Sequence, residues 1–435
     1  MLSVDLQIAA RNLTRHRRRN LLLGGALAAV TALLVLLSGL TAGVEHAMLV
    51  SSTTLLTGHV NVGGFFKITS GTAAPLVTEV PRLSARVRTL VPELDYLSAR
   101  GRGWAKAVSA STSMDLVLSG VEVAAEPGFA RVIRPVEGRL EDLAQPNTVL
   151  LFQGQADRLK VKVNDLLTLS APTARGVNNT ADVRVAVIAR NVGLLSAFSA
   201  FIQADTLRRL YGLSPTTTGA IHLYLRRPED APAVAARLRA ALAADGWRVM
   251  EPEPQPYWMK LMQKVPSEDW TGQKLDVTTW EDEMGQFKQF IFGLRALTGL
   301  LVFVLMAVVV IGILNTLAIA VRERTREIGT LRAIGMQRRK VLWLFVLESA
   351  LLGLTGAAAG AAVAALVAAL LDRIGIGIPE GMQVFLMQEK LSFLLRPGAV
   401  VGEVLFLAGV TVAASLLPAR RAARLKPITA MHHIG

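Results

Sequence analysis

Residues 322–341 read RERTREIGTLRAIGMQRRKV, a short connector with seven basic and two acidic side chains between two long apolar segments. Such a basic connector is typical of a membrane protein, because short loops rich in Lys and Arg stay on the cytoplasmic side. The composition agrees. The chain has 52% hydrophobic and 18% charged residues, against roughly 25% charged residues in an average soluble domain. We therefore tested a membrane interpretation first.

Four segments are long and apolar enough to cross a bilayer, whose core of about 30 Å requires about 20 residues of helix. The first two contain no charged side chain, the third contains only Glu348, and the weaker fourth contains only Glu403. The segments are residues 21–43, 296–321, 341–371 and 399–417. The expected fold is an α-helical membrane protein with four transmembrane helices and a large mixed α/β periplasmic domain between helices 1 and 2.

Basic residues gather in three places, which indicates the orientation. Residues 1–20, 322–340 and 418–435 carry +13 of the net charge of +14. We expect these three segments to be cytoplasmic, whereas residues 44–277 and a short loop at 372–398 face outward. The positive charge then faces anionic lipid headgroups and does not indicate nucleic-acid binding.

The N-terminal segment 1–20 has Leu6, Ala9, Ala10 and Leu13 at helical spacing. This pattern predicts an amphipathic helix along the inner membrane surface that leads into the first span. A disordered basic tail is one alternative. A cleaved signal peptide is another, but an apolar segment of 23 residues exceeds its usual core of about 7–15.

The outward region contains strand-like apolar runs at residues 148–152, 183–189 and 221–225. We expect a β-rich subdomain at about 127–214, inserted into an α/β unit. The chain has no cysteine, so its core must hold without disulfides.

Residues 278–321 lead into the second span. Thr278 and Glu281 have the spacing of a capping box, and no proline follows before residue 321. One continuous helix here would reach roughly 64 Å, about twice the apolar thickness, and could relay motion as a stalk. The alternative is two helices broken near Gly285 or Gly293.

The connector also has a helical pattern. Ile328, Leu331 and Gly335 share one face, with Ile334 at its edge, while the arginines project elsewhere. A loop that only sets orientation does not need this apolar face, so the pattern predicts docking on a soluble partner.

The connector resembles the hallmark segment of FtsX-like ABC transporter permeases, a family that includes macrolide-exporter and lipoprotein-releasing permeases. The similarity continues in QRRKVLWLFVLESALLGLTGAAAG, in the N-terminal AARNLTRHRRRNLLLGG and in the closing LLPARRAARLKPITAM. The resemblance implies that the connector is a coupling helix seated in an ATPase cleft. The residues to which it assigns this role are Arg324, Glu327, Ile328, Leu331, Arg332 and Gly335.

The resemblance implies a permease subunit in the bacterial inner membrane that works with a cytoplasmic ABC ATPase dimer and a second permease copy or paralogue. ATP and Mg²⁺ would bind the partner, since this chain has no G-x-x-x-x-G-K-[ST] motif. We expect lipoprotein release or related envelope transport. The alternatives are efflux of small amphiphiles or peptides as in macrolide exporters, activation of a cell-wall hydrolase without transport, and a one-component receptor or membrane enzyme.

A periplasmic adaptor or carrier is a further possible partner, although the family's carrier-recruiting loop would fall near residues 171–182, where this sequence has only a short polar loop. We found no catalytic, cofactor or metal constellation, and His432 with His433 alone is a poor metal site.

Several intramembrane residues are secondary candidates. Asn315 and Glu348 are polar within spans, and we expect Glu348 to pair with connector arginines, a functional role being the alternative. Gly353, Gly356 and Gly360 predict close helix packing, with a contact between two permeases as one form of it.

Overall fold

The computed structural model describes residues 7, 11, 17–69, 72–173, 176–323, 330, 333–379, 382–383, 386 and 390–423. The chain divides into two compact units. The first, which we call the helical unit, comprises Met1–Glu45, Phe292–Gly377 and Lys390–Gly435. The second, the α/β unit, comprises His46–Ile291 and Ile378–Glu389.

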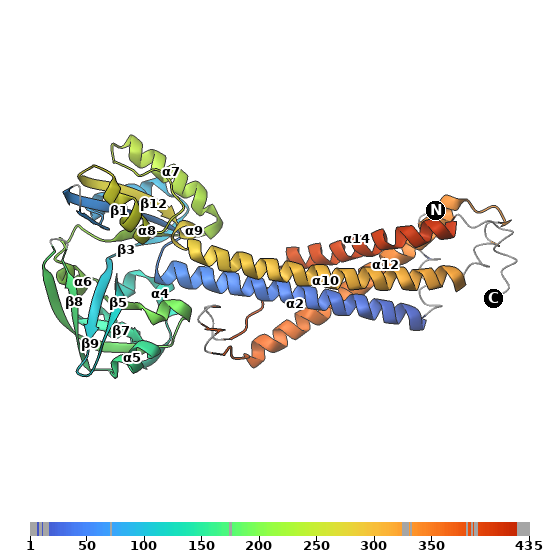
Figure 1. Ribbon diagram of the computed structural model, residues 1–435, viewed down its shortest axis with the longest axis horizontal. Helices are drawn as coiled ribbons and strands as arrows, with labels where there is room; N and C mark the ends of the chain where they lie inside the picture. The colour runs from blue at the N-terminus through green and yellow to red at the C-terminus, as the bar shows by residue number, and fades with distance from the viewer. Residues whose placement is uncertain are drawn as a thin grey trace. The chain divides into compact units, whose positions relative to one another are not determined.

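Four long apolar helices dominate the helical unit and run beside one another (Figure 1). They are α2 (Arg17–Leu55), α10 (Gly285–Glu323), α12 (Arg338–Ile374) and α14 (Pro397–Ala423). Each is long and apolar enough to cross a membrane, which confirms the four expected spans. The helix expected at 1–20 lies mostly outside the described residues, and residues 17–20 already belong to α2.

Glycines of α12 permit close packing inside the helical unit. A Cβ atom at Gly360 would lie 2.2 Å from the carbonyl oxygen of Ala28 on α2, and one at Gly353 would lie 3.0 Å from Thr411 Cβ on α14. Gly356 is buried against Gly24 and Leu27 in the same way. The expected close packing is therefore present. Helices α2 and α14 of the same chain lie against these positions, and a contact between two permeases stays a prediction.

Polar contacts also tie α2 to α10. Arg295 donates two hydrogen bonds to the Glu45 carboxylate, one of them from Nη2 to Oε2 at 2.8 Å. The hydroxyls of Thr41 and Thr298 lie 3.0 Å apart. Small polar residues commonly connect membrane helices in this way, since an unpaired polar group is costly in hydrocarbon.

The approach to the second span differs from the expected single helix. The short helix α9 (Trp280–Glu283) ends at Met284, and α10 then begins at Gly285 and continues through Gly293. The N-cap is Thr279, one residue later than expected, and Asp282 completes the capping box in place of a glutamate. The alternative of a break near Gly285 is thus correct. Even so, α10 has 39 residues and spans roughly 58 Å.

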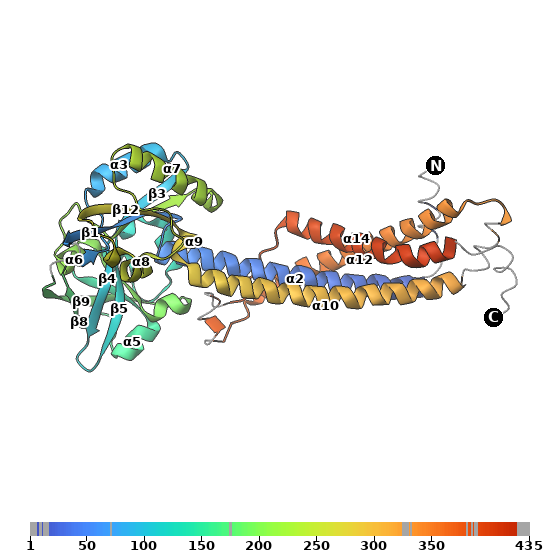
Figure 2. The same cartoon turned by 45° about the horizontal axis from the view of Figure 1, so that its top comes forward.

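The α/β unit contains a five-stranded antiparallel sheet. Its order is β12-β1-β11-β3, with β2 beside β1. The strands are β1 (Val60–Thr69), β2 (Thr72–Ala74), β3 (Leu94–Arg100), β11 (Ala220–Leu225) and β12 (Gly272–Thr279). Helices α3 (Val80–Leu90) and α7 (Ala231–Ala244) pack on one face and bury an aliphatic core with Val62, Leu223 and Val277 (Figure 2).

A second sheet has seven strands in the order β6-β9-β7-β10-β5-β4-β8, and β8 also pairs with β9, so six of the strands close into a ring. The strands are β4 (Arg102–Val108), β5 (Ser113–Val121), β6 (Pro135–Gly138), β7 (Thr148–Phe152), β8 (Leu166–Pro172), β9 (Asn178–Ala189) and β10 (Ser199–Gln203). The expected subdomain start at about 127 is wrong, because β4 and β5 belong to this sheet and it begins at Arg102. Short helices accompany it: α4 (Pro127–Val132), α5 (Gln153–Leu159) and α6 (Ala204–Tyr211).

Most of the polar segment at 171–182 is strand and not loop. β8 and β9 pair up to Pro172 and Asn178, and the Thr173 N–H donates to the carbonyl oxygen of Val177 at 2.8 Å. The described residues at the position expected for a carrier-recruiting loop therefore belong mostly to paired strands.

The Gly360 contact leads to a stability prediction. Gly360→Ala should lower the free energy of unfolding by about 1–3 kcal/mol, because α2 and α12 must move apart to accommodate the new methyl group. Gly312→Ala on α10 is the matched control, since no neighbouring atom of the described residues lies within 4 Å of its added Cβ. Thermal unfolding of the purified chain in detergent, followed by circular dichroism, compares the two. Equal stability would contradict the packing.

Candidate functional site

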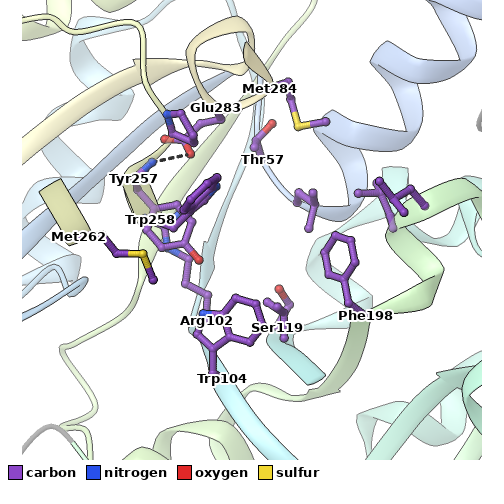
Figure 3. A pocket seen from close by; sticks show the side chains of 15 residues that line it. Thr57, Arg102, Trp104, Ser119, Phe198, Tyr257, Trp258, Met262, Glu283 and Met284 are labelled. Carbon is purple, nitrogen blue, oxygen red and sulfur yellow. Dashed lines mark hydrogen bonds between the residues drawn. The ribbon is translucent and has the colours of Figure 1, made fainter. Parts of the chain in front are cut away.

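The α/β unit contains a cavity of about 470 Å³, which we call the Arg102 pocket (Figure 3). Its walls come from β4 and β5, the 3₁₀ helix Gly193–Ala197, α8 (Tyr257–Gln263) and the end of α9. Three lining residues, Leu56, Thr57 and Met284, stand next in sequence to the ends of α2 and α10. The remaining lining residues are Arg102, Trp104, Val117, Ser119, Leu194, Leu195, Phe198, Pro256, Tyr257, Trp258, Met262 and Glu283.

The pocket wall is largely apolar and is accessible to solvent. Trp104 is 60% exposed and Met262 is 72% exposed, and Leu194 and Trp258 are also exposed. Scattered exposed apolar residues are normal, but a cluster around a cavity indicates a binding surface. The pocket therefore has the general composition of a ligand site, with many apolar atoms and few polar ones.

Arg102 is the cation of this pocket. It is the first residue of β4, and its guanidinium carbon lies 3.4 Å from the centroid of the Tyr257 ring. Its Nε atom is buried without a hydrogen-bond acceptor. Across the described part of the chain, no hydrogen bond or ion pair involves this side chain. A guanidinium has five N–H donors, so Arg102 retains donors that an incoming acceptor could use.

Glu283 is the pocket's acidic residue, and other groups hold its carboxylate. It accepts hydrogen bonds from the Tyr257 N–H at 3.1 Å and from the Thr278 hydroxyl at 2.8 Å. Burial raises the pKa of Glu283, and the nearby positive charge of Arg102 opposes that shift. Glu283 thus anchors the start of α8 to α9 and does not neutralise Arg102 by direct contact.

A buried ion pair lies behind α8. Lys260 Nζ donates to both carboxylate oxygens of Asp276, at 3.0 and 2.9 Å, and both side chains are almost fully buried. Burial raises the pKa of Asp276, while Lys260 lowers it. The pair joins α8 to β12, so it fixes the wall that carries Tyr257, Trp258 and Met262.

The sequence-based candidates lie elsewhere. Arg324, Glu327, Ile328, Leu331 and Arg332 are outside the described residues, and their coupling role stays a prediction. Gly335 has a φ of +102°, which suits a glycine at a turn, and the neighbouring Ile334 is 85% exposed.

The two intramembrane polar candidates are both helical. Asn315 is exposed on α10, and Glu348 is half-buried on α12. The pairing of Glu348 with connector arginines stays a prediction. None of the described residues forms a cluster of three or more His, Asp or Glu side chains able to hold a metal ion.

Sequence reasoning missed the Arg102 pocket, because its residues come from six separate segments. One local signal existed. Arg102 and Trp104 alternate with small residues in RGRGWAK, residues 100–106, so they share one face of a strand. That pattern alone does not show that Tyr257 and Met262 lie opposite.

The buried pair generates a pH-dependent prediction. Lys260→Met should lower the free energy of unfolding by about 3–5 kcal/mol at pH 7, because it leaves the Asp276 carboxylate buried without the cation that contacts it. Loss of Lys260 should raise the pKa of Asp276 further, so the deficit should shrink as the pH falls through that pKa and Asp276 becomes neutral. Chemical unfolding followed by tryptophan fluorescence at several pH values measures this.

Two variants complete that test. Adding Asp276→Asn to Lys260→Met should recover stability at pH 7, since no buried charge remains. Lys264→Met, which removes the partner of the more accessible Glu253, is the control and should cost less than about 1 kcal/mol. A deficit of Lys260→Met that is independent of pH would show that lost packing, and not an unpaired charge, causes it.

One family model matches the C-terminal part of this chain. A family described as "FtsX-like permease C-terminal" matches residues 299–427. The pyoverdine export ATP-binding/permease protein PvdT of Pseudomonas fluorescens (strain Pf-5) is 35% identical over 121 residues, which are 28% of this chain and 16% of PvdT. The ABC transporter permease YknZ of Bacillus subtilis is 34% identical over 123 residues, 28% of each chain.

Among solved structures, the periplasmic region of MacB from Actinobacillus actinomycetemcomitans aligns with 43% of this chain and 86% of its own length, at 11% identity and a TM-score of 0.30. The chain spans 16% of PvdT and 28% of YknZ, so their similarity concerns a part of each protein. The matched region comprises most of α10, the connector, α12 and α14. Residues 299–427 of the chain are therefore similar to the C-terminal domain of FtsX-like permeases.

Proposed function

We propose that the chain is the membrane-spanning subunit of an ABC transporter, driven by a separate cytoplasmic ATPase dimer. The family match that includes the connector carries this proposal. YknZ is named a permease, whereas PvdT is named an ATP-binding/permease protein and this chain matches only a fraction of it. The sequence has no phosphate-binding loop, which supports a separate source of ATP hydrolysis.

The exposed Ile334 supports docking of the connector on that ATPase. The side chain of Ile334 is 85% exposed, so a partner could bury it. Burial of its side chain against a partner would be favourable by about 1.5–3 kcal/mol. The arginine-rich segments favour a cytoplasmic location for the connector and both termini, with the α/β unit outside the inner membrane.

The helix lengths support transmission of motion. α2 and α10 have 39 residues each, more than a bilayer core requires, and Arg295 joins them through Glu45. ATPase closure that moves the connector would move α10, and the paired α2 would follow. A second permease copy or paralogue completes the complex, and exposed apolar side chains of α10 offer surface to it or to lipid.

Lipoprotein release or related envelope transport is the role we favour, with efflux of small amphiphiles or peptides next. Most of the segment where a carrier-recruiting loop would fall is paired in β8 and β9, which does not favour a periplasmic carrier. Activation of a cell-wall hydrolase without transport is the alternative of a different class, and affinity capture of such a hydrolase by the purified complex would favour it.

The docking proposal predicts the effect of a new carboxylate. Leu331→Asp and Ile334→Asp should each abolish substrate-stimulated ATP hydrolysis, because an unpaired charge buried in the ATPase cleft costs about 3–5 kcal/mol. This cost corresponds to more than about a hundredfold weaker association. Gln337→Asp is the control, since residue 337 is the exposed N-cap of α12, where aspartate is favourable.

The measurement is ATPase activity and co-purification of the reconstituted complex with each variant. Normal hydrolysis and full co-purification with Leu331→Asp and Ile334→Asp would contradict the docking proposal. Loss in all three variants, Gln337→Asp included, would indicate damage to the turn and not to a docking face.

A further inference from the structure

The Arg102 pocket combines a cation with no partner and an apolar wall. The guanidinium stacks on the Tyr257 ring and makes no hydrogen bond or ion pair with any described residue. The other charged side chains near the pocket have hydrogen-bond partners within the protein. Lys260 pairs with Asp276, and the oxygens of Glu283 accept from Tyr257 and Thr278. Of these charged groups, only Arg102 makes no hydrogen bond or ion pair with a described residue, although Glu283 and Asp276 are near enough to attract it.

The neighbouring Arg100 shows how this chain treats a guanidinium that has only a structural role. Arg100 is fully buried, pairs with Glu126 and donates to the carbonyl oxygen of Leu55 at 3.1 Å. Its donors are used inside the protein. Arg102, two residues later on the strand that follows Gly101, faces a cavity of about 470 Å³, which is within the range of small-molecule sites.

The other lining residues indicate what kind of group a ligand would have beside the one that binds Arg102. Trp104, Trp258, Phe198 and Met262 supply flat or flexible apolar surface, and two of them are more than half exposed (Figure 3). Such side chains accommodate a hydrocarbon chain without directional bonds. A wholly apolar ligand would leave Arg102 without an acceptor, and a cationic ligand would meet repulsion.

We propose that the Arg102 pocket binds an amphiphile with one anionic head group, a carboxylate or a phosphate, and an apolar chain. The head group accepts hydrogen bonds from the Arg102 guanidinium, and the chain lies against the indole rings and Met262. This inference does not depend on the ATPase, because binding can be measured on the permease alone. It adds a ligand site in the α/β unit to the proposed function.

Photo-crosslinking of the full-length chain in phosphatidylcholine nanodiscs tests the site. The probe is a fatty acid with a diazirine in its chain, and the alcohol and the primary amine of the same chain are the comparisons. Mass spectrometry locates the labelled peptides, so labelling of α10 and α12 by probe dissolved in lipid serves as an internal reference. We expect the pocket peptides at 102–119 and 257–263 to be labelled by the acid at least about tenfold more than by the alcohol or the amine.

Variants separate the head group from the chain. Arg102→Met should reduce pocket labelling by the acid at least about tenfold and leave labelling by the alcohol unchanged, which also shows that the pocket remains folded. Arg102→Lys should retain part of the acid labelling. Trp104→Ala, at an exposed position, should reduce labelling by the acid and by the alcohol together. Arg82→Met is the control, since Arg82 also stacks on an aromatic ring, Trp247, but does not line the pocket.

Addition of phosphatidylglycerol to the nanodiscs distinguishes two sources of the anion. Competition would identify a membrane lipid as an occupant, and lack of competition would favour a single-chain acid. Equal labelling of the pocket by acid, alcohol and amine would overturn the proposal. Acid labelling that is unchanged in both Arg102→Met and Trp104→Ala would also overturn it.

Discussion

The close approach of α12 to α2 is the contact on which the helical unit depends. Between apolar helices in lipid there is little hydrophobic driving force, so association relies on backbone proximity and on a few polar contacts. Gly356 and Gly360 provide the proximity, and the Thr41–Thr298 and Glu45–Arg295 pairs hold α10 against α2. α2 thereby becomes the helix against which two others are positioned. Leu56 and Thr57, which follow it directly, are also part of the Arg102 pocket wall.

Charge is handled in two different ways in the α/β unit. Arg100 with Glu126 and Lys260 with Asp276 are buried and paired, which is the arrangement that lets an ion survive away from water. Arg102 departs from this rule within the same short stretch of chain. A charged group whose donors find no acceptor within the protein is expected mainly at a functional site, because a ligand can supply the missing acceptor there. The contrast between two arginines on either side of Gly101 is therefore more informative than either residue alone.

The sequence predicted the parts of this fold that depend on local composition. Apolar length alone located the four long helices, and strand-like runs at 148–152 and 221–225 match β7 and β11. Errors arose where a choice depended on tertiary structure. The capping box was displaced by one residue because Asp282 takes the role usually held by glutamate, and the start of the second sheet was missed because β4 and β5 join it only through β8 and β10. The glycine motif was expected with the correct residues, but the helices that cover it could not be chosen from sequence.

The Arg102 pocket was beyond sequence reasoning for the same reason, since residue 102 meets residue 257 only after two sheets have formed. The connector is the reverse case, because its pattern is readable in the sequence while most of its residues lie outside the described part of the chain.

The central claim is that a cytoplasmic ATPase covers this connector. Because the chain has no cysteine, Ile334→Cys introduces a single thiol, and its rate of alkylation can be measured with and without the ATPase. The account predicts strong protection of Cys at this position in the complex, and rapid, unchanged alkylation in both states would contradict it.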